Sequence, residues 1–185
     1  IDLCVDNDNK INIVKIVEAY IENKKIEHDE NQEYKDFGNV TYTEKSRAVI
    51  KVQDGCDRFC SYCIIPYARG RVRSRKPENV IKEITEIAQN GIKEVVITGI
   101  HVASYGKDFK EEYRLIDLLE EINQLEGIER IRLGSIEPTL ITEEFLERAK
   151  KLEEYQIKNN KQITAVEANQ NTEMYKIVEY LIKNK

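Results

Sequence analysis

The chain of 185 residues predicts an α/β fold in which parallel strands alternate with helices. Three short apolar runs, at 48–53, 95–97 and 131–133, each stand before a segment whose apolar residues recur at helical spacing. This alternation is typical of a parallel sheet joined by right-handed crossovers. With 41% hydrophobic and 34% charged residues and no long apolar run, the composition predicts a soluble protein with one ordinary core.

The N-terminal part predicts a short strand, a helix and a linker. Residues 1–5 form an apolar run that predicts the strand, and the residues that mark one face of the helix are Ile13, Val14, Ile16, Val17, Tyr20 and Ile21. Residues 25–46 are polar and acidic with little periodicity, which predicts a linker. His28 lies in this linker, and we expect it to be solvent-exposed with no chemical role.

Three strand–helix units follow the linker. The helix of the first unit begins at Pro77 and ends before Gly91, and its apolar stripe is Val80, Ile81, Ile84, Ile87 and Ala88. The second helix is marked by Leu115, Ile116, Leu118, Leu119 and Ile122, and the third by Phe145, Leu146, Ala149 and Leu152. Residues 156–170 are polar, which predicts no strand there. A last amphipathic stripe predicts a tail helix that covers a sheet edge: Met174, Ile177, Val178, Leu181 and Ile182.

Three cysteines directly after the first strand form a Cys-x-x-x-Cys-x-x-Cys loop: Cys56, Cys60 and Cys63. Three thiolates can hold three corners of a 4Fe–4S cluster and leave the fourth iron open. A structural zinc site needs four ligands, and three cysteines leave one unpaired in a disulfide framework. Buried inert thiols are the remaining alternative, although the polar residues of the loop do not suggest a core. Cys4 lies apart from the motif, and we expect it to be a core thiol.

The charge of the chain is uneven. The net charge is −5, yet the segment from Lys45 to Lys76 holds nine basic and two acidic residues. Within it Arg69, Arg71, Arg73 and Arg75 alternate, so an extended backbone would place all four guanidinium groups on one side. Such a row suits phosphate groups or a cofactor carboxylate. The alternatives are a solvated loop or ion pairs with the many nearby Glu residues.

Polar residues also follow the second and third strands. Chemistry in parallel sheets and barrels collects at the carboxyl ends of the strands. The cysteine loop, Gly99-Ile100-His101 and Ser135-Ile136-Glu137 should therefore emerge on one rim. His101 is either a substrate or cofactor contact or a loop residue bonded to backbone. Arg132 faces either the barrel interior, as an anion ligand, or the helix layer.

Three stretches of the chain resemble the radical S-adenosylmethionine (SAM) methylthiotransferases. They are residues 53–70 with the following Arg73-Ser74-Arg75, residues 98–106, and residues 132–138. The second stretch is similar to the enzymes that modify N6-threonylcarbamoyladenosine in tRNA, because the related isopentenyladenosine enzymes usually carry Gly-Gln-Asn at the position of Gly99-Ile100-His101. The resemblance covers about residues 47–153.

This resemblance implies a cofactor site. Cys56, Cys60 and Cys63 would ligate a 4Fe–4S cluster, and SAM would chelate the open iron and yield a 5′-deoxyadenosyl radical on reduction. The chemistry would belong to the cluster and cofactor, with no further catalytic side chain. The residues that would contact SAM are Tyr62 near the adenine, Gly99 near the amino group, and Ser135 and Glu137 near the ribose or methionine.

The resemblance also implies a domain organisation. Residues 1–24 would be a remnant of the N-terminal methylthiotransferase domain, 25–46 a linker, 47–154 a partial radical SAM (β/α) barrel of about three strand–helix units, and 155–185 a divergent tail. Members of the family usually contain more such units, further cysteines for a second, sulfur-donating cluster, and a C-terminal tRNA-binding domain. We therefore expect a fragment that cannot thiolate tRNA alone.

The expected partners are tRNA, an electron donor and the missing remainder of the enzyme, with no membrane and a cytoplasmic location. Two other functions stay open at this point. One is a non-catalytic zinc- or thiol-stabilised module that uses the arginine row to hold RNA or protein. The other is a radical SAM enzyme that acts on another substrate.

Overall fold

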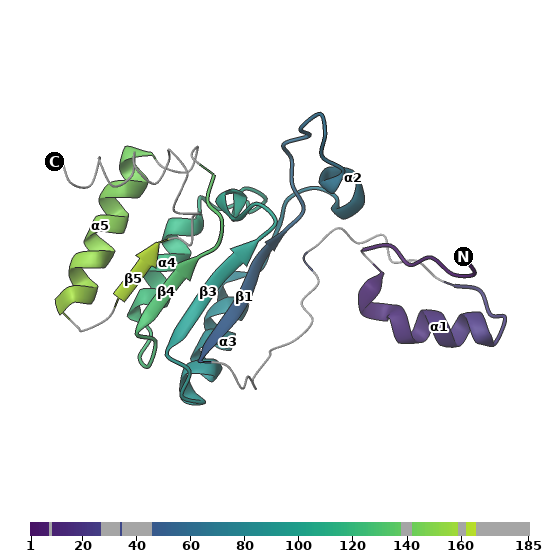
Figure 1. Ribbon diagram of the computed structural model, residues 1–185, viewed down its shortest axis with the longest axis horizontal. Coiled ribbons are helices and arrows are strands. Elements are labelled where there is room, and N and C mark those ends of the chain that lie inside the picture. The colour runs from purple at the N-terminus through teal and green to yellow at the C-terminus, as the bar shows by residue number, and fades with distance from the viewer. Residues whose placement is uncertain (8, 27–33, 35–45, 138–141, 159–161, 166–185) are drawn as a thin grey trace.

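A five-stranded sheet forms the centre of the molecule, in the order β2-β1-β3-β4-β5 (Figure 1). The computed structural model describes residues 1–7, 9–26, 34, 46–137, 142–158 and 162–165. The strands are β1 (Arg47–Asp54), β2 (Arg73–Ser74), β3 (Glu94–Gly99), β4 (Arg130–Leu133) and β5 (Gln162–Ala165). β1, β3, β4 and β5 run parallel, and β2 is antiparallel to β1. The predicted α/β partial barrel is thus confirmed.

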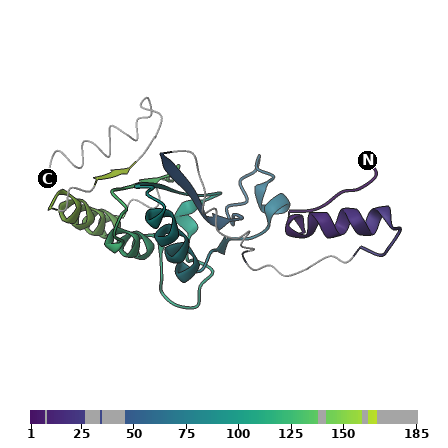
Figure 2. The same ribbon diagram turned by 90° about the horizontal axis from the view of Figure 1, so that it is seen from below.

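The helices lie mainly on one face of this sheet (Figures 1 and 2). They are η1 (Lys10–Asn12), α1 (Ile13–Ile21), α2 (Ile65–Arg69), α3 (Pro77–Gln89), η2 (Val102–Ser104), α4 (Leu115–Gln124) and α5 (Glu143–Lys158). α3, α4 and α5 cover the sheet, whereas α1 lies apart from it, beyond α2 (Figure 1). Among the described residues, none of these helices combines the length and the apolar content that a membrane crossing requires.

The core lies between the sheet and its helices. Alternate residues of each strand point into it, as the two-residue period of a strand requires. On β1 these are Ala48, Ile50 and Val52, on β3 Val95 and Ile97, and on β4 Ile131 and Leu133. They pack against the apolar stripes of α3 and α4, in which Val80, Ile84, Leu118 and Ile122 have no exposed surface. On the opposite face of β1, Val49 is exposed.

The boundaries of α3 follow from its sequence. Pro77 occupies the first helical position, where the missing N–H costs no hydrogen bond. Gly91 follows the helix with a φ of 84°, a left-handed conformation that glycine adopts without strain. The predicted strand–helix order from Pro77 to Leu133 is confirmed by α3, β3, α4 and β4.

Three sequence expectations about elements are corrected. Residues 1–5 form no strand, because a short apolar run needs a partner strand and none lies beside it in the described part. Conversely, β5 lies within the stretch 156–170 that predicted no strand, and it pairs with β4 in the register Arg130↔Gln162. β2 was also not expected, since two residues give no periodic signal. The proposed tail helix at 174–182 falls outside the described residues.

Candidate functional site

The three clustered cysteines lie on one loop at the carboxyl end of β1. This cysteine loop (residues 55–64) leads into α2, after which the chain returns to pair β2 with β1. The N–H of Cys56 donates to the carbonyl oxygen of Gly70 at 3.1 Å, and that of Cys63 donates to Cys60 at 2.9 Å. Cys56 is buried, Cys63 half-buried and Cys60 exposed. The loop is therefore closed at its base and presents its thiols from the interior to the surface.

A glycine is required where the cysteine loop leaves β1. Gly55 has a φ of 71°, and a Cβ there would lie 1.8 Å from the carbonyl oxygen of Arg71. The positive φ favours glycine, and the backbone contact excludes any side chain. Gly55 thus lets the outgoing and returning chains approach closely beside Cys56.

The donor set of the cysteine loop fits a 4Fe–4S cluster better than a single metal ion. Within the described residues, no three His, Cys, Asp or Glu side chains are grouped to hold one ion. A closed zinc site would need four such ligands around a small centre. A 4Fe–4S cube takes one thiolate at each iron, and one short, partly exposed loop of this chain supplies three thiols.

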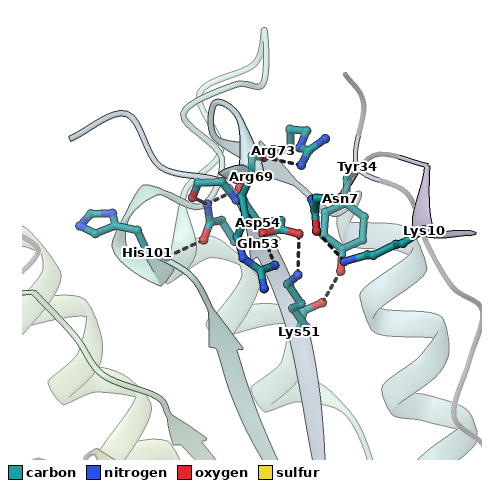
Figure 3. Close-up of polar contacts among 10 residues, drawn as sticks. Asn7, Lys10, Tyr34, Lys51, Gln53, Asp54, Arg69, Arg73 and His101 are labelled. Carbon is teal, nitrogen blue, oxygen red and sulfur yellow. Dashed lines mark hydrogen bonds and ion pairs between the residues drawn. The ribbon is translucent and has the colours of Figure 1, made fainter. Parts of the chain in front are cut away.

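Gln53 joins the cysteine loop to the loop that follows β3 (Figure 3). Its side chain has no exposed surface. Its Nε2 donates to the carbonyl oxygens of Asp54 at 2.6 Å and Gly55 at 2.7 Å, and its Oε1 accepts from the N–H of His101 at 2.7 Å. A Cβ on Gly99 would lie 2.9 Å from the same Oε1, so the close packing of β1 and β3 here needs glycine. Gln53 is not among the residues that the sequence singles out, although a polar amide near the end of an apolar strand could have indicated its role.

The loops after β1, β3 and β4 meet through polar side chains, as their predicted shared rim requires. The carboxylate of Glu137 accepts hydrogen bonds from the guanidinium of Arg58 and, at 2.5 Å, from Nε2 of His101. Since a carboxylate only accepts, Nε2 carries a hydrogen, and Nδ1 of His101 contacts the Ser104 hydroxyl at 2.7 Å. His101 is therefore held from both ring nitrogens and, through Gln53, from its backbone.

A buried acid supports the base of the cysteine loop. Asp54 accepts from Nζ of Lys51 at 2.6 Å, from the N–H of Gly55 at 2.8 Å and from Arg69 at 3.2 Å (Figure 3). Burial raises the pKa of Asp54, but the hydrogen bonds from Lys51 and Gly55 and the charges of Lys51 and Arg69 outweigh it, so its pKa lies below the usual range. Asp54 is thus an ionised anchor for the basic residues around it.

The N-terminal segment lies beside this anchor. Burial, followed by the charge of Lys51, lowers the pKa of Lys10, and the charge of Asp54 acts in the opposite direction. Nζ of Lys10 donates to the side-chain oxygen of Asn7 at 3.0 Å. The hydroxyl of Tyr34 donates to the carbonyl oxygen of Lys51 at 3.0 Å (Figure 3).

The four residues of the arginine row do not lie on one extended segment. Arg69 ends α2, Arg71 is exposed beside Asp57 at 3.6 Å, and its guanidinium lies 4.9 Å from the centre of the Phe59 ring. Arg73 is buried in β2 and donates to the carbonyl oxygen of Arg69 at 2.6 Å. Arg75 is buried and forms an ion pair with Glu83 of α3. The four guanidinium groups therefore do not form one accessible row. Arg69 belongs to a helix, Arg71 is exposed, and Arg73 and Arg75 are buried.

The remaining candidates are the proposed SAM contacts and Arg132. Tyr62 and Ser135 are exposed, and Gly99 ends β3. Arg132 lies on the face opposite the helices and its Nε donates to Glu94 at 2.6 Å, so the helix-layer alternative is wrong. Burial raises the pKa of Glu94, but hydrogen bonds from Arg132 and Arg130 and their charges lower it overall.

The last two residues that the sequence singled out are Cys4 and His28. Cys4 is exposed, so its expected place in the core is wrong. The segment around it forms no strand that could bury alternate side chains. His28 lies outside the described residues.

The chain is similar to known enzymes over most of this region. A model of the Radical SAM superfamily matches residues 50–155. Threonylcarbamoyladenosine tRNA methylthiotransferase MtaB of Bacillus subtilis (strain 168) is 46% identical over 115 residues, which cover 62% of this chain and 25% of that protein. The tRNA-2-methylthio-N(6)-dimethylallyladenosine synthase of Desulforamulus reducens is 46% identical over 108 residues, 58% of this chain and 24% of that protein. The chain thus spans about a quarter of the length of these two curated relatives.

A solved structure is also similar. It is the radical SAM methyltransferase TsrM from Kitasatospora setae with cobalamin and a [4Fe-4S] cluster bound, at 19% identity and a TM-score of 0.31, over 64% of this chain and 30% of that one. The family model includes all three cysteines and the rim loops after β1, β3 and β4. Because it covers more than half of the chain, this protein belongs to the radical SAM superfamily, and it is similar to the tRNA methylthiotransferases within it.

Proposed function

We propose that this chain is the cluster- and SAM-binding part of an enzyme that adds a methylthio group to N6-threonylcarbamoyladenosine in tRNA. The observation that carries the proposal is the linkage of the three rim loops. Gln53 ties the cysteine loop to the loop after β3, and Glu137 ties both to the loop after β4. A cofactor held between loops that already contact one another needs little reorganisation on binding.

Each part of the rim has a proposed role. Cys56, Cys60 and Cys63 hold the cluster, which, with SAM bound, supplies a radical able to abstract hydrogen from an unreactive carbon. Tyr62, Gly99, Ser135 and Glu137 are the positions proposed to contact SAM. Gln53, Asp54 and Gly55 hold the cysteine loop in place, and they exclude water from its base because Gln53 and Asp54 are buried.

The nucleoside is the finer part of the proposal. The two curated relatives named above have equal identity to this chain but different modified adenosines in their names. The sequence Gly99-Ile100-His101 favours threonylcarbamoyladenosine, and the structure adds that His101 contacts Glu137. We propose tRNA as the partner, with Arg69 and Arg71 as the accessible members of the arginine row for its phosphates, and an electron donor in the cytoplasm.

The domain division is proposed along the same lines. Residues 47–154 form the partial radical SAM unit, 1–24 belong to a preceding methylthiotransferase domain, 25–46 link the two, and 155–185 are the tail. The longer relatives supply the precedent for parts beyond this unit.

The test is anaerobic reconstitution with iron and sulfide, followed by electron paramagnetic resonance of the reduced protein with and without SAM. We expect a cubane signal that shifts on addition of SAM, because the open iron gains a ligand. Replacement of Cys60 by Ala should abolish the signal, whereas Cys4→Ala, the matched control at an exposed thiol outside the loop, should retain it. No signal, or a signal that ignores SAM, would contradict the proposal.

The same preparation tests the activity of the chain alone. We expect no methylthiolated nucleoside by mass spectrometry of treated tRNA, because the sulfur-donating cysteines of the family have no counterpart in this sequence. Product formed by this chain alone would overturn that expectation and leave the cofactor site untouched.

A further inference from the structure

Polar side chains from three separate loops meet at the rim, two of them charged. We call Arg58, His101 and Glu137 the rim triad: Glu137 Oε2 accepts from both Arg58 Nη2 and His101 Nε2. Arg58 stands between Cys56 and Cys60, so its backbone is within two residues of two of the proposed cluster ligands. The triad thus lies beside the proposed cluster ligands.

The members of the rim triad differ in how firmly they are held. The His101 side chain is 14% exposed; its ring contacts Ser104 and Glu137, and its backbone N–H donates to Gln53. The Arg58 and Glu137 side chains are 41% and 33% exposed. A solvent-exposed ion pair is worth little, since water and salt screen it. A second carboxylate can therefore replace Glu137 on Arg58 at small cost, while His101 stays in place.

The two nucleosides considered differ in whether the N6 substituent carries a carboxylate. The threonylcarbamoyl group ends in a carboxylate and carries a hydroxyl and a urea. The dimethylallyl group is a hydrocarbon without a hydrogen-bonding atom. A guanidinium binds a carboxylate through two parallel N–H···O bonds, with geometric as well as electrostatic preference. A rim of Arg, His and Glu therefore suits the first substituent and offers the second no favourable contact.

The geometry points to Arg58 as the receptor for the carboxylate of the N6 substituent, in exchange for Glu137, with His101 positioned beside it to bond the remaining polar atoms. This inference rests on the proposed function and assigns its substrate specificity to the rim triad. It also gives the basis for rejection, because a site built to hydrogen-bond a substrate discriminates strongly against an analogue that lacks the group.

The test measures binding of free nucleosides to the reconstituted full chain, by equilibrium dialysis without SAM. The probes are N6-threonylcarbamoyladenosine, N6-dimethylallyladenosine and adenosine. We expect the first to bind most tightly, and Arg58→Gln to weaken it by about tenfold or more through loss of a charge-assisted pair. The affinities of the other two nucleosides should not change, because neither has a carboxylate.

Two further variants separate this role from a structural one. Glu137→Gln removes the internal competitor for Arg58, so it should tighten N6-threonylcarbamoyladenosine; damage to the fold would weaken it. Lys93→Gln is the control, an exposed cation that pairs with Glu129 before the first residue of β3, at the opposite end of that strand from His101. It should leave all three affinities unchanged.

Equal affinity for the three nucleosides, equal losses in the Arg58 and Lys93 variants, or weaker binding in Glu137→Gln would each overturn the inference. The outcome is separate from that of the proposed function. A cluster signal that responds to SAM, together with no preference among nucleosides, removes only the role of the rim triad. The absence of a cluster signal, or a cluster signal that does not change when SAM is added, contradicts the proposed function itself.

Discussion

Helices α1 and α3 have the same kind of sequence pattern but opposite environments. In α3, Val80, Ile84 and Ile87 are at most 1% exposed. In α1, Val14 and Ile21 are 66% and 71% exposed, and Ile16 is the one buried residue of that helix. α3 lies against the sheet, whereas α1 lies apart from it (Figure 1). The period of apolar residues therefore predicts a helix, but a neighbouring surface decides whether the helix is buried.

The polar contacts of the two regions differ in the same way. On the α3 side, Arg75 and Glu83 form an ion pair with side chains 5% and 6% exposed. The hydroxyl of Tyr105, also buried, donates to the carbonyl oxygen of Arg75 at 2.8 Å. Beyond the end of α1, Lys24 and Glu22 pair with side chains 70% and 56% exposed. Changes on the α3 side should therefore cost more free energy of unfolding than equal changes on the α1 side.

The largest difference in the free energy of unfolding should come from breaking the buried Arg75–Glu83 pair and the exposed Lys24–Glu22 pair. Glu83→Leu leaves the Arg75 charge buried, and we expect a loss of about 3–5 kcal/mol in the free energy of unfolding. Glu22→Leu, at the exposed pair, should change it by no more than about 1 kcal/mol. Urea denaturation of both variants gives the comparison. A loss below about 1 kcal/mol in Glu83→Leu would show that the buried pair does not hold α3 to the sheet.

Truncation of one apolar side chain in each helix tests the same contrast. Ile84→Ala opens a cavity in the core and should cost about 2–5 kcal/mol. Val14→Ala on α1 should stay within about 0.5 kcal/mol, since its side chain is mostly exposed. The measurement is again urea denaturation, with circular dichroism to confirm retained helix. Similar costs at the two positions would mean that α1 is covered in solution.

Gln53 tests whether the rim is as fixed as the core. Gln53→Leu leaves the carbonyl oxygens of Asp54 and Gly55 and the N–H of His101 without their buried partner. We expect a loss of about 1–3 kcal/mol in the free energy of unfolding. We also expect a changed cubane signal after reconstitution, because the backbone before Cys56 is released. The control is Ile84→Val, which should lower stability and leave that signal as in the unmodified protein.

The smallest expected effect is on the acid limb of the stability curve, the range in which the free energy of unfolding falls as pH is lowered. Asp54 has a lower pKa in the folded protein than in the unfolded chain, so its stabilisation is present above the unfolded value of about 3.9 and is lost as pH falls through the folded value. Asp54→Asn should flatten this limb in urea titrations between about pH 2 and pH 6. An unchanged slope in the variant would assign the acid sensitivity to other carboxylates.

The sequence predicted those features that repeat along the chain and missed those that depend on distant neighbours. The periodic apolar runs predicted α3, α4, β1, β3 and β4, and the parallel order then placed the three rim loops together. β2 has two residues, too few for a period, and β5 lies in a polar stretch of the sequence. Both pair with strands whose edges are otherwise open, β2 with β1 and β5 with β4.

The same reason explains the errors at the site. Arg75 alternates with its neighbours in sequence, but Glu83 of α3 removes it from the surface. The role of Gln53 depends on His101, which lies 48 residues further on. The cysteine loop was predictable because all three thiols lie within one short motif and need no distant partner to be recognised.

The closed base of the cysteine loop has a consequence for oxygen damage. The cysteine loop and α2 together form one excursion of the chain from β1 to β2. Protein contacts alone hold its two ends together: the pairing of β1 with β2, the Cys56–Gly70 hydrogen bond and the Asp54–Arg69 contact. These contacts do not involve a metal, so they remain when iron is lost. The chain of the loop then gains little conformational entropy, because its ends stay together. A protein bleached by air should therefore keep its fold and be repaired by fresh iron and sulfide, with no need to refold first.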